Sequence, residues 1–181
     1  MKLSLCYNFN HDLNNIRYLN KMKTNFEKVV EFNKCFGLPH RDTPVHSVTR
    51  DDPKLTKLRL DLILEETREL QEAIENHDFT EVVDALADIL YVVYGAGSSF
   101  GVNLDEAFRL VHDSNMSKLC KSVEEAEATV AWYMENRETT GYDTPAYRKG
   151  TDGEYWVVYN ESTGKILKSI NYHPVNFKSI L

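Results

Sequence analysis

The chain has 181 residues, a formal net charge of −7 and a hydrophobic fraction of 42%. Eight Phe, ten Tyr and two Trp give enough apolar surface to exclude a chain that is disordered throughout, and the length fits one domain. The acidic balance argues against a nucleic-acid polymer as partner, since that partner needs clustered Lys and Arg, and favours metal cations. No apolar run reaches the roughly 18 residues of a membrane span. The three cysteines form no CxxC pair, so we expect a cytoplasmic protein without membrane contact.

The N-terminal part divides into an extension, a helix and a loop. Residues 1–22 are polar and rich in Asn, and we assign them no element. Apolar residues at helical spacings predict a helix over Asn25–Phe36, which Gly37 ends. Residues 38–51 are expected to form a loop.

Two longer helices should follow as a hairpin. Asp52 can cap the first of them, with Pro53 at its first position, and the helix should continue to about Asn76. Asp78 can cap the next, which should end at Gly101. Because the connection between them is so short, we expect the two helices to lie antiparallel.

Two further helix starts and a pair of strands complete the predicted fold. Capping sequences at Asn103 and Ser122 predict a fourth and a fifth helix. Residues 154–159 and 165–170 are rich in β-branched and aromatic residues, which predicts a β-hairpin. The expected fold is an all-α bundle of about five helices with a small C-terminal β-hairpin. The expected organisation is an N-terminal extension (1–22), a helical domain (23–137), and a loop, hairpin and tail packed on the same domain (138–181).

Acidic residues gather on the predicted hairpin. Its first helix carries Glu65, Glu66 and Glu69 within E-E-T-R-E, and residues three or four apart share a helix face. Its second helix carries Asp84 and Asp88 within an almost wholly apolar run. A helix that is apolar on nearly all sides is buried, and a buried carboxylate needs a proton, a base or a metal.

The antiparallel arrangement would bring these carboxylates into one pocket. Oxygen ligands suit hard cations, so the pattern predicts Mg²⁺ or Mn²⁺, and two such ions could clamp a phosphate. The alternative is that the glutamates form a solvated face and that the aspartates lie at an exposed edge.

A second group of polar residues lies near the end of the predicted fourth helix. Asn115 and Lys118 are three positions apart, so an amide and an ammonium on one face could hold phosphate oxygens. The alternative is a helix C-terminus with a Lys placed favourably on the helix dipole.

Three strings together resemble a known family: LILEETRELQEAI, VVDALADILYVVYGAGSSFGVNLDEAF and VHDSNMSKL. They look like those of the MazG-like, all-α nucleoside triphosphate pyrophosphatases, which include phosphoribosyl-ATP pyrophosphohydrolase and the dimeric dUTPases. The resemblance implies hydrolysis of a nucleoside triphosphate between its α and β phosphates, with Mg²⁺ or Mn²⁺, in a homodimer or higher homo-oligomer.

The resemblance also assigns roles to residues. It implies an EExxE motif carried by Glu65, Glu66 and Glu69, and an ExxD motif whose Asp matches Asp88. The sequence departs from the second motif, because Ala85 stands where the family has Glu. Either Asp84 substitutes from one residue earlier, which we prefer, or Glu81 and Asp84 form the motif in another register.

Three functions remain open at this point. The first is a nucleoside triphosphate pyrophosphohydrolase that cleans the nucleotide pool, with Glu65 as the catalytic group and Glu66, Glu69, Asp84 and Asp88 as metal ligands. In that role Asn115 and Lys118 match the family's phosphate-contacting residues. The second is phosphoribosyl-ATP hydrolysis in histidine synthesis, and the third is a catalytically silent binding protein of the same fold.

Overall fold

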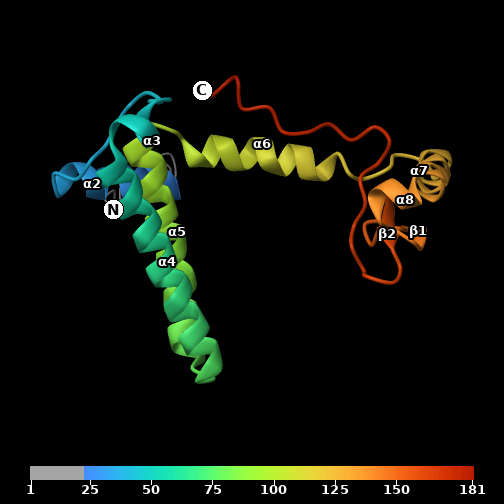
Figure 1. Ribbon diagram of the computed structural model, residues 1–181, viewed down its shortest axis with the longest axis horizontal. Helices are drawn as coiled ribbons and strands as arrows, with labels where there is room; N and C mark the ends of the chain where they lie inside the picture. The colour runs from blue at the N-terminus through green and yellow to red at the C-terminus, as the bar shows by residue number, and fades with distance from the viewer. Residues whose placement is uncertain (1–22) are drawn as a thin grey trace, which may run out of the picture. The chain divides into compact units, whose positions relative to one another are not determined.

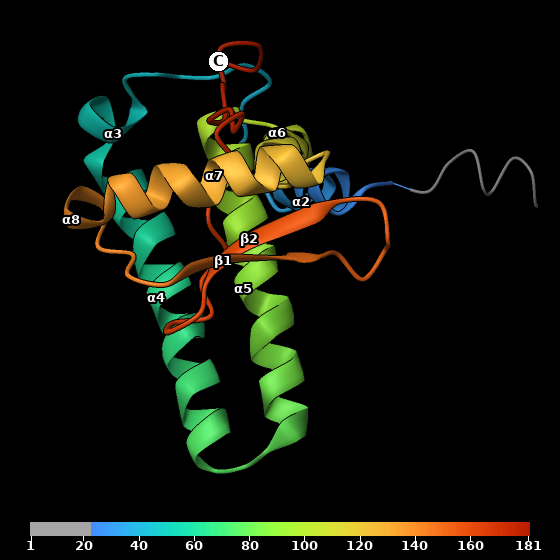
Figure 2. The same cartoon turned by 90° about the vertical axis from the view of Figure 1, so that its right-hand side faces the viewer.

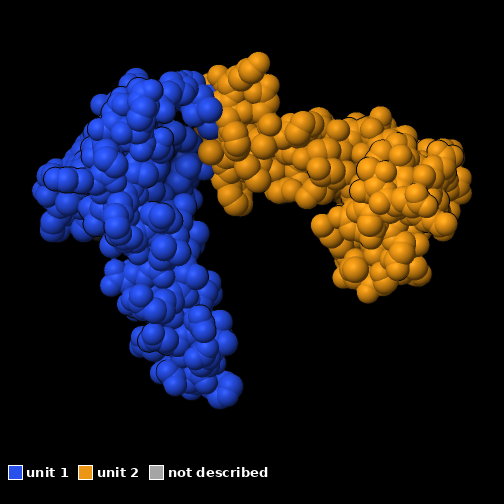
Figure 3. Space-filling view, viewed as in Figure 1, with its two compact units in different colours: residues 1–105, 180–181 blue, residues 106–179 orange. Residues whose placement is uncertain are grey.

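The computed structural model describes residues 23–181, which form seven helices and two strands. The predicted fold class, mostly helical with a small C-terminal sheet, is confirmed in this part of the chain. The predicted N-terminal extension lies outside it. The chain divides into two compact units: unit 1 holds the described residues up to Asp105 together with 180–181, and unit 2 holds 106–179 (Figure 3). The predicted domain boundaries, with a helical domain over 23–137, stay a prediction.

Unit 1 is built on an antiparallel pair of helices, α4 (Pro53–Glu75) and α5 (Phe79–Phe100), which lie side by side along their length (Figures 1 and 2). The Asp52 carboxylate accepts from the Leu55 N–H at 3.1 Å, and Pro53 occupies the first helical position. Asp78 caps α5 by accepting from the N–H groups of Thr80 and Glu81. The predicted hairpin and both of its caps are therefore confirmed.

Helix α2 (Asn25–Cys35) packs on α5. Thr24 and Glu27 exchange hydrogen bonds at its start, a complete capping box that satisfies backbone N–H groups left free by the helix. Aromatic rings pack between the two helices: the ring of Phe32 lies edge-on to that of Tyr91, with ring centroids 5.5 Å apart. The helix predicted over Asn25–Phe36 is thus confirmed.

The segment between α2 and α4 was predicted as a loop and contains one short helix, α3 (Val48–Asp51). Val48 is buried, which anchors the turn. The loop also fits closely against the end of α5. A Cβ at Gly101 would lie 1.9 Å from the Thr43 carbonyl oxygen, and the φ of Gly101 is +79°, so only glycine suits this position.

In unit 2, helix α7 (Val123–Glu135) packs against a small sheet. Helix α6 (Leu104–Met116) begins at the boundary of the units and leads to α7 and the short α8 (Arg137–Thr140). Strands β1 (Pro145–Lys149) and β2 (Trp156–Asn160) pair antiparallel. The core between α7 and the sheet contains these buried residues: Cys120, Ala126, Tyr133, Val158 and Leu167.

The predicted hairpin is wrong in one of its strands. Residues 156–160 do form a strand, but their partner is 145–149 rather than 165–170. The later segment makes an isolated bridge between Tyr159 and Ile166, with one backbone hydrogen bond from Leu167 N–H to the Val158 carbonyl and one from Asn160 N–H to the Lys165 carbonyl. Beyond Leu167 its backbone bonds to α7: the Lys168 N–H donates to the Tyr133 hydroxyl and the Ile170 N–H donates to Thr129 Oγ1. The hydroxyls of Tyr133 and Thr129 thus accept from N–H groups that would otherwise be free to bond to a neighbouring strand.

A buried amide organises the end of β2. Asn160 is wholly enclosed, and its Nδ2 donates to Asp143 at 3.1 Å and to Ser162 at 2.8 Å. Its Oδ1 accepts from the Thr144 N–H at 3.0 Å. The amide is satisfied on both sides, so burying it costs little, and it fixes the path of the chain into and out of the sheet.

In residues 23–181, each helix taken singly is too short or too polar to cross a bilayer.

Candidate functional site

The predicted acids come together on the α4–α5 hairpin. The pKa of Glu66 is raised, first by partial desolvation and then by the charges of Glu69, Asp88, Glu65 and Asp84. The other four predicted carboxylates therefore lie near enough to Glu66 to act on its charge. They come from the middle of α4 and the first half of α5, which the tight connection at 76–78 folds together.

Burial of the two aspartates, which the apolar run predicted, is not found within the single chain. Asp84 and Asp88 are both exposed, whereas Ala85 between them is buried. The apolar residues around them are exposed as well, because α5 has neighbours on only part of its circumference. The expectation failed because an apolar run predicts that a helix will be buried, and a second chain can supply the surface that buries it.

The donor set fits a hard divalent cation. It consists of carboxylate oxygens, and their mutual repulsion is relieved by a positive charge placed among them. In residues 23–181, however, no group of three or more His, Cys, Asp or Glu side chains is close enough to hold a metal ion. The acids are neighbours, but they do not form a complete metal-binding site within one chain.

The structure bears on the choice between Asp84 and Glu81. Asp84 is among the charges that act on Glu66, and Glu81 is not. Two other acids of α4 point away from the group: Glu72 lies 3.9 Å from Arg68, and Glu75 accepts from Gln71 at 2.7 Å. Asp84 thus lies near Glu66, and the choice of Asp84 over Glu81 as a metal ligand stays a prediction.

The predicted phosphate-binding pair belongs to unit 2. Lys118 Nζ donates to Asn115 Oδ1 at 2.7 Å, so the two side chains do meet at the end of α6. Both are still available for an anion, because the pair carries a net positive charge. Their contact with a substrate held at the acids stays a prediction.

A Ser, His and Asp set in unit 1 resembles a nucleophilic triad and is excluded by burial. His40 Nδ1 lies 3.1 Å from Ser98 Oγ, and His40 Nε2 lies 2.9 Å from the Asp42 carboxylate. Ser98, however, has no exposed surface and also accepts from the Asn33 amide at 3.0 Å. A nucleophile must reach its substrate, so this set instead fastens the loop after α2 to the end of α5.

Sequence reasoning missed Arg59. It lies on the buried stripe of α4, four positions after buried Leu55 and seven before Glu66, and only 6% of its surface is exposed. Its Nε is enclosed without a hydrogen-bond partner. Burial lowers the pKa of this guanidinium. The spacing of Arg59 on an apolar stripe was the signal that could have found it.

Comparisons with known proteins agree with this arrangement. Residues 29–115, which contain all five acids and Asn115, match the protein-family model described as phosphoribosyl-ATP pyrophosphohydrolase. An uncharacterized protein of Acanthamoeba polyphaga mimivirus is 29% identical over an alignment of 243 residues, which covers 87% of this chain and 96% of that protein. Over residues 29–115 the chain is therefore similar to the phosphoribosyl-ATP pyrophosphohydrolase family, of the MazG-like superfamily.

Proposed function

We propose that this protein is a Mg²⁺-dependent nucleoside triphosphate pyrophosphohydrolase, which cleaves between the α and β phosphates to give a nucleoside monophosphate and pyrophosphate. The observation that carries the proposal is the convergence of five carboxylates on α4 and α5, where four of them add to the effect of desolvation in raising the pKa of Glu66. Such a group is costly unless it serves to bind cations. The family match over residues 29–115 supports pyrophosphohydrolase chemistry of this kind.

The residues divide into two roles in this proposal. Glu66, Glu69, Asp84 and Asp88 hold Mg²⁺ or Mn²⁺, which supplies positive charge to the polyphosphate and lowers the pKa of water. Glu65, exposed beside them, accepts a proton from the attacking water. The water oxygen bonds to the α-phosphorus as the bond from that phosphorus to the bridging oxygen breaks, and pyrophosphate leaves. Lys118 and Asn115 bind phosphate oxygens.

The apolar surface of the hairpin supports a homodimer or a higher homo-oligomer as part of the proposal. Leu64 on α4 is 55% exposed and Leu90 on α5 is 56% exposed. Other large apolar side chains of the two helices share this exposure: Leu58, Leu60, Ile74, Phe79, Val83 and Leu86. So many exposed large apolar side chains on one pair of helices favour a surface that a partner covers. A second copy would cover it and enclose the neighbouring acids.

A specific observation keeps phosphoribosyl-ATP as a second candidate substrate. The matching family is described by that activity. Both substrates undergo the same reaction at a triphosphate, so the acids do not discriminate between them. A catalytically silent member of the fold is the third possibility.

A substrate panel tests the proposal. The full-length protein is incubated with the common ribonucleoside and deoxyribonucleoside triphosphates and with phosphoribosyl-ATP, with Mg²⁺ and with EDTA. We expect stoichiometric pyrophosphate and monophosphate, and no release in EDTA. Release of inorganic phosphate from a triphosphate would place the cleavage at a different bond. No turnover across the panel, by protein that is folded and oligomeric, would favour the silent alternative.

A further inference from the structure

Arg59 is a buried cation for which the described residues supply no counter-charge. It makes neither a hydrogen bond nor an ion pair within the described part of the chain, and its Nε is fully enclosed. A guanidinium does not lose its proton in a protein, so its charge persists inside unit 1. An unpaired buried charge is strongly unfavourable, which indicates that an anion joins it in the functional state.

The opposite helix leaves room for this guanidinium. A Cβ built on Gly95 of α5 would lie 3.2 Å from Arg59 Nη1, closer than an ordinary contact. Val29 of α2 adjoins the same point, with its Cγ1 4.0 Å from that Cβ position. Residues of three helices, α2, α4 and α5, therefore meet around the Arg59 guanidinium.

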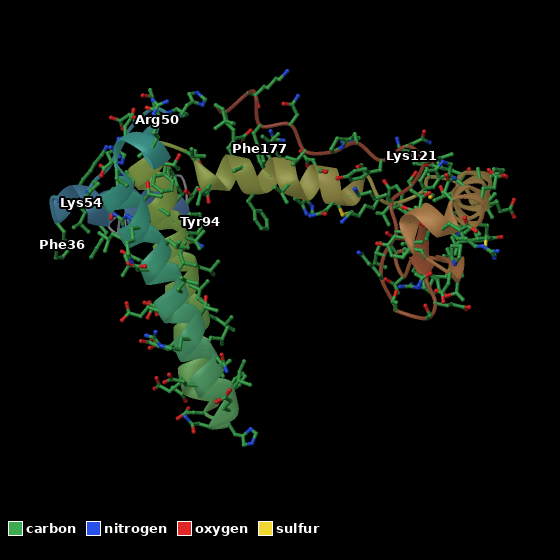
Figure 4. The ribbon with its side chains drawn as sticks, viewed as in Figure 1. Phe36, Arg50, Lys54, Tyr94, Lys121 and Phe177 are labelled. Carbon is green, nitrogen blue, oxygen red and sulfur yellow. The ribbon has the colours of Figure 1, made fainter. Side chains whose placement is uncertain are left out.

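Val29 also lines a cavity, whose described lining does not include Arg59 itself. It has a volume of about 210 Å³ and lies between α2 and α5, and it is lined by Asn25, Lys28, Val29, Ala87, Leu90, Tyr91 and Tyr94. Tyr94 is labelled on α5 in Figure 4. Among the described residues of this lining, Lys28 is the one that carries a charge, and none is a carboxylate. In a protein with a net charge of −7, this local excess of positive charge selects an anion.

One wall of the cavity comes from the part of α5 that carries Asp88. Ala87 and Tyr91 of its wall flank Asp88 in sequence. Along the hairpin, Arg59 and Glu66 are seven positions apart on α4, as are Asp88 and Gly95 on α5. Seven residues rise about 10 Å, so the Arg59 layer lies two turns from the Glu66 layer on one face. One extended anionic substrate can contact both layers.

We propose that Arg59 and Lys28 form a cationic subsite that binds a phosphoryl group of the nucleotide substrate, at the end of the α2–α5 cavity and two helical turns from the acids. This inference rests on the proposed function and adds the residues that hold the substrate away from the metal. A planar guanidinium offers two parallel N–H donors to phosphate oxygens, and the ammonium of Lys28 adds a second charge.

The test measures substrate binding and product inhibition in the full-length protein with Mg²⁺. Arg59→Gln is expected to raise KM on the order of 10- to 100-fold, the loss typical of a hydrogen bond to a charged group. It should also weaken inhibition by the monophosphate product or by pyrophosphate, whichever carries the group bound here. Lys28→Gln should raise KM roughly 2- to 5-fold, since this lysine is exposed.

Stability measurements separate binding from a structural role. Arg59→Met removes the charge and keeps the bulk, so we expect its melting temperature to be unchanged or higher while binding is lost. Gly95→Ala narrows the place of the guanidinium and should weaken binding less than Arg59→Gln does. Lys54→Gln removes an exposed charge from the same helix outside the cavity, and KM should not change.

The outcomes decide between this inference and its alternatives. Unchanged KM and unchanged product inhibition in Arg59→Gln would overturn the inference. Loss of the oligomeric state as the sole effect of Arg59→Gln would also overturn it, because the anion that pairs with Arg59 would then belong to a second copy of the chain. If the unmodified protein turns over no nucleotide, calorimetric titration with inorganic pyrophosphate still tests the subsite. Tighter binding by the unmodified protein than by Arg59→Gln would then support it although the proposed function had failed.

Discussion

The two units of this protein satisfy their own side chains to different degrees. In unit 2 the buried polar groups of the core find partners, as Asn160 and Thr129 do, and the apolar core residues are fully enclosed. In unit 1 the α4–α5 hairpin carries clustered like charges, a buried unpaired guanidinium and large exposed apolar residues. The difference shows where the chain keeps capacity for further contacts.

Unsatisfied groups of this kind cost stability within one chain, and function is the usual reason that they persist. A cation would relieve the acids of unit 1, an anion would pair with Arg59, and a second copy would cover its leucines. Unit 2 also exposes large apolar side chains, such as Phe108 and Trp132, but its enclosed side-chain nitrogen and oxygen atoms all have hydrogen-bond partners. Each prediction below tests this contrast.

The largest effect is expected on turnover when a unit 1 acid is removed. Glu69→Ala and Asp88→Ala should each lower pyrophosphate release by about 100-fold or more, which exceeds the loss from groups that only support a metal ligand. Glu72→Gln is the matched control, because Glu72 lies on the same helix and pairs with Arg68. Steady-state assays measure all three, and retained release in either alanine variant would refute the site.

The next effect compares a buried leucine of unit 2 with an exposed leucine of unit 1. Leu167→Ala in unit 2 should lower the free energy of unfolding by about 2–5 kcal/mol, since Leu167 is only 2% exposed. Leu64→Ala removes the same atoms from an exposed position of α4, so in a monomer its effect should stay within about 0.5 kcal/mol. Denaturant unfolding measures both. A larger loss for Leu64→Ala that depends on protein concentration would indicate that a second copy covers this face.

A smaller effect is expected from relieving repulsion among the acids. The pKa of Glu66 is raised, first by desolvation and then by its acidic neighbours, so its ionised form destabilises the fold above that pKa. Glu66→Gln should therefore raise stability at pH 7 in EDTA by less than about 1 kcal/mol, because the group is only partly buried. The gain should vanish below about pH 4.3, where glutamate is protonated in both states. Thermal unfolding across pH measures it, and a gain confined to acidic pH would contradict the explanation.

The smallest effect compares two thiols. Cys120 in unit 2 has no exposed surface, and burial raises the pKa of its thiol, whereas Cys35 at the end of α2 is exposed. We expect a thiol reagent to modify Cys35 more than about 10 times faster than Cys120 in the native protein. Peptide mapping of the labelled sites measures this ratio. Comparable rates would show that the core of unit 2 opens easily.

Local rules predicted most of the helices. Three helices start with a side chain that accepts from a free backbone N–H group: Asp52, Asp78 and Ser122. These hydrogen bonds join only near neighbours in sequence, so a local pattern predicts them. The strand at 145–149 was missed and the segment at 165–170 was misassigned, because the side chains of Tyr133 and Thr129 decide which backbone groups are free to pair. No local pattern contains that competition.

The sequence by itself determined the helix caps, the hairpin of α4 and α5, and the acids that this hairpin holds together, because helical spacing and a short connection place residues three to seven apart on one face. Only the tertiary structure decided that Arg59 is buried without a partner opposite Gly95, and that β1 rather than 165–170 pairs with β2. These outcomes depend on contacts between segments distant in the chain, where the available space and the competing donors are set by the fold as a whole.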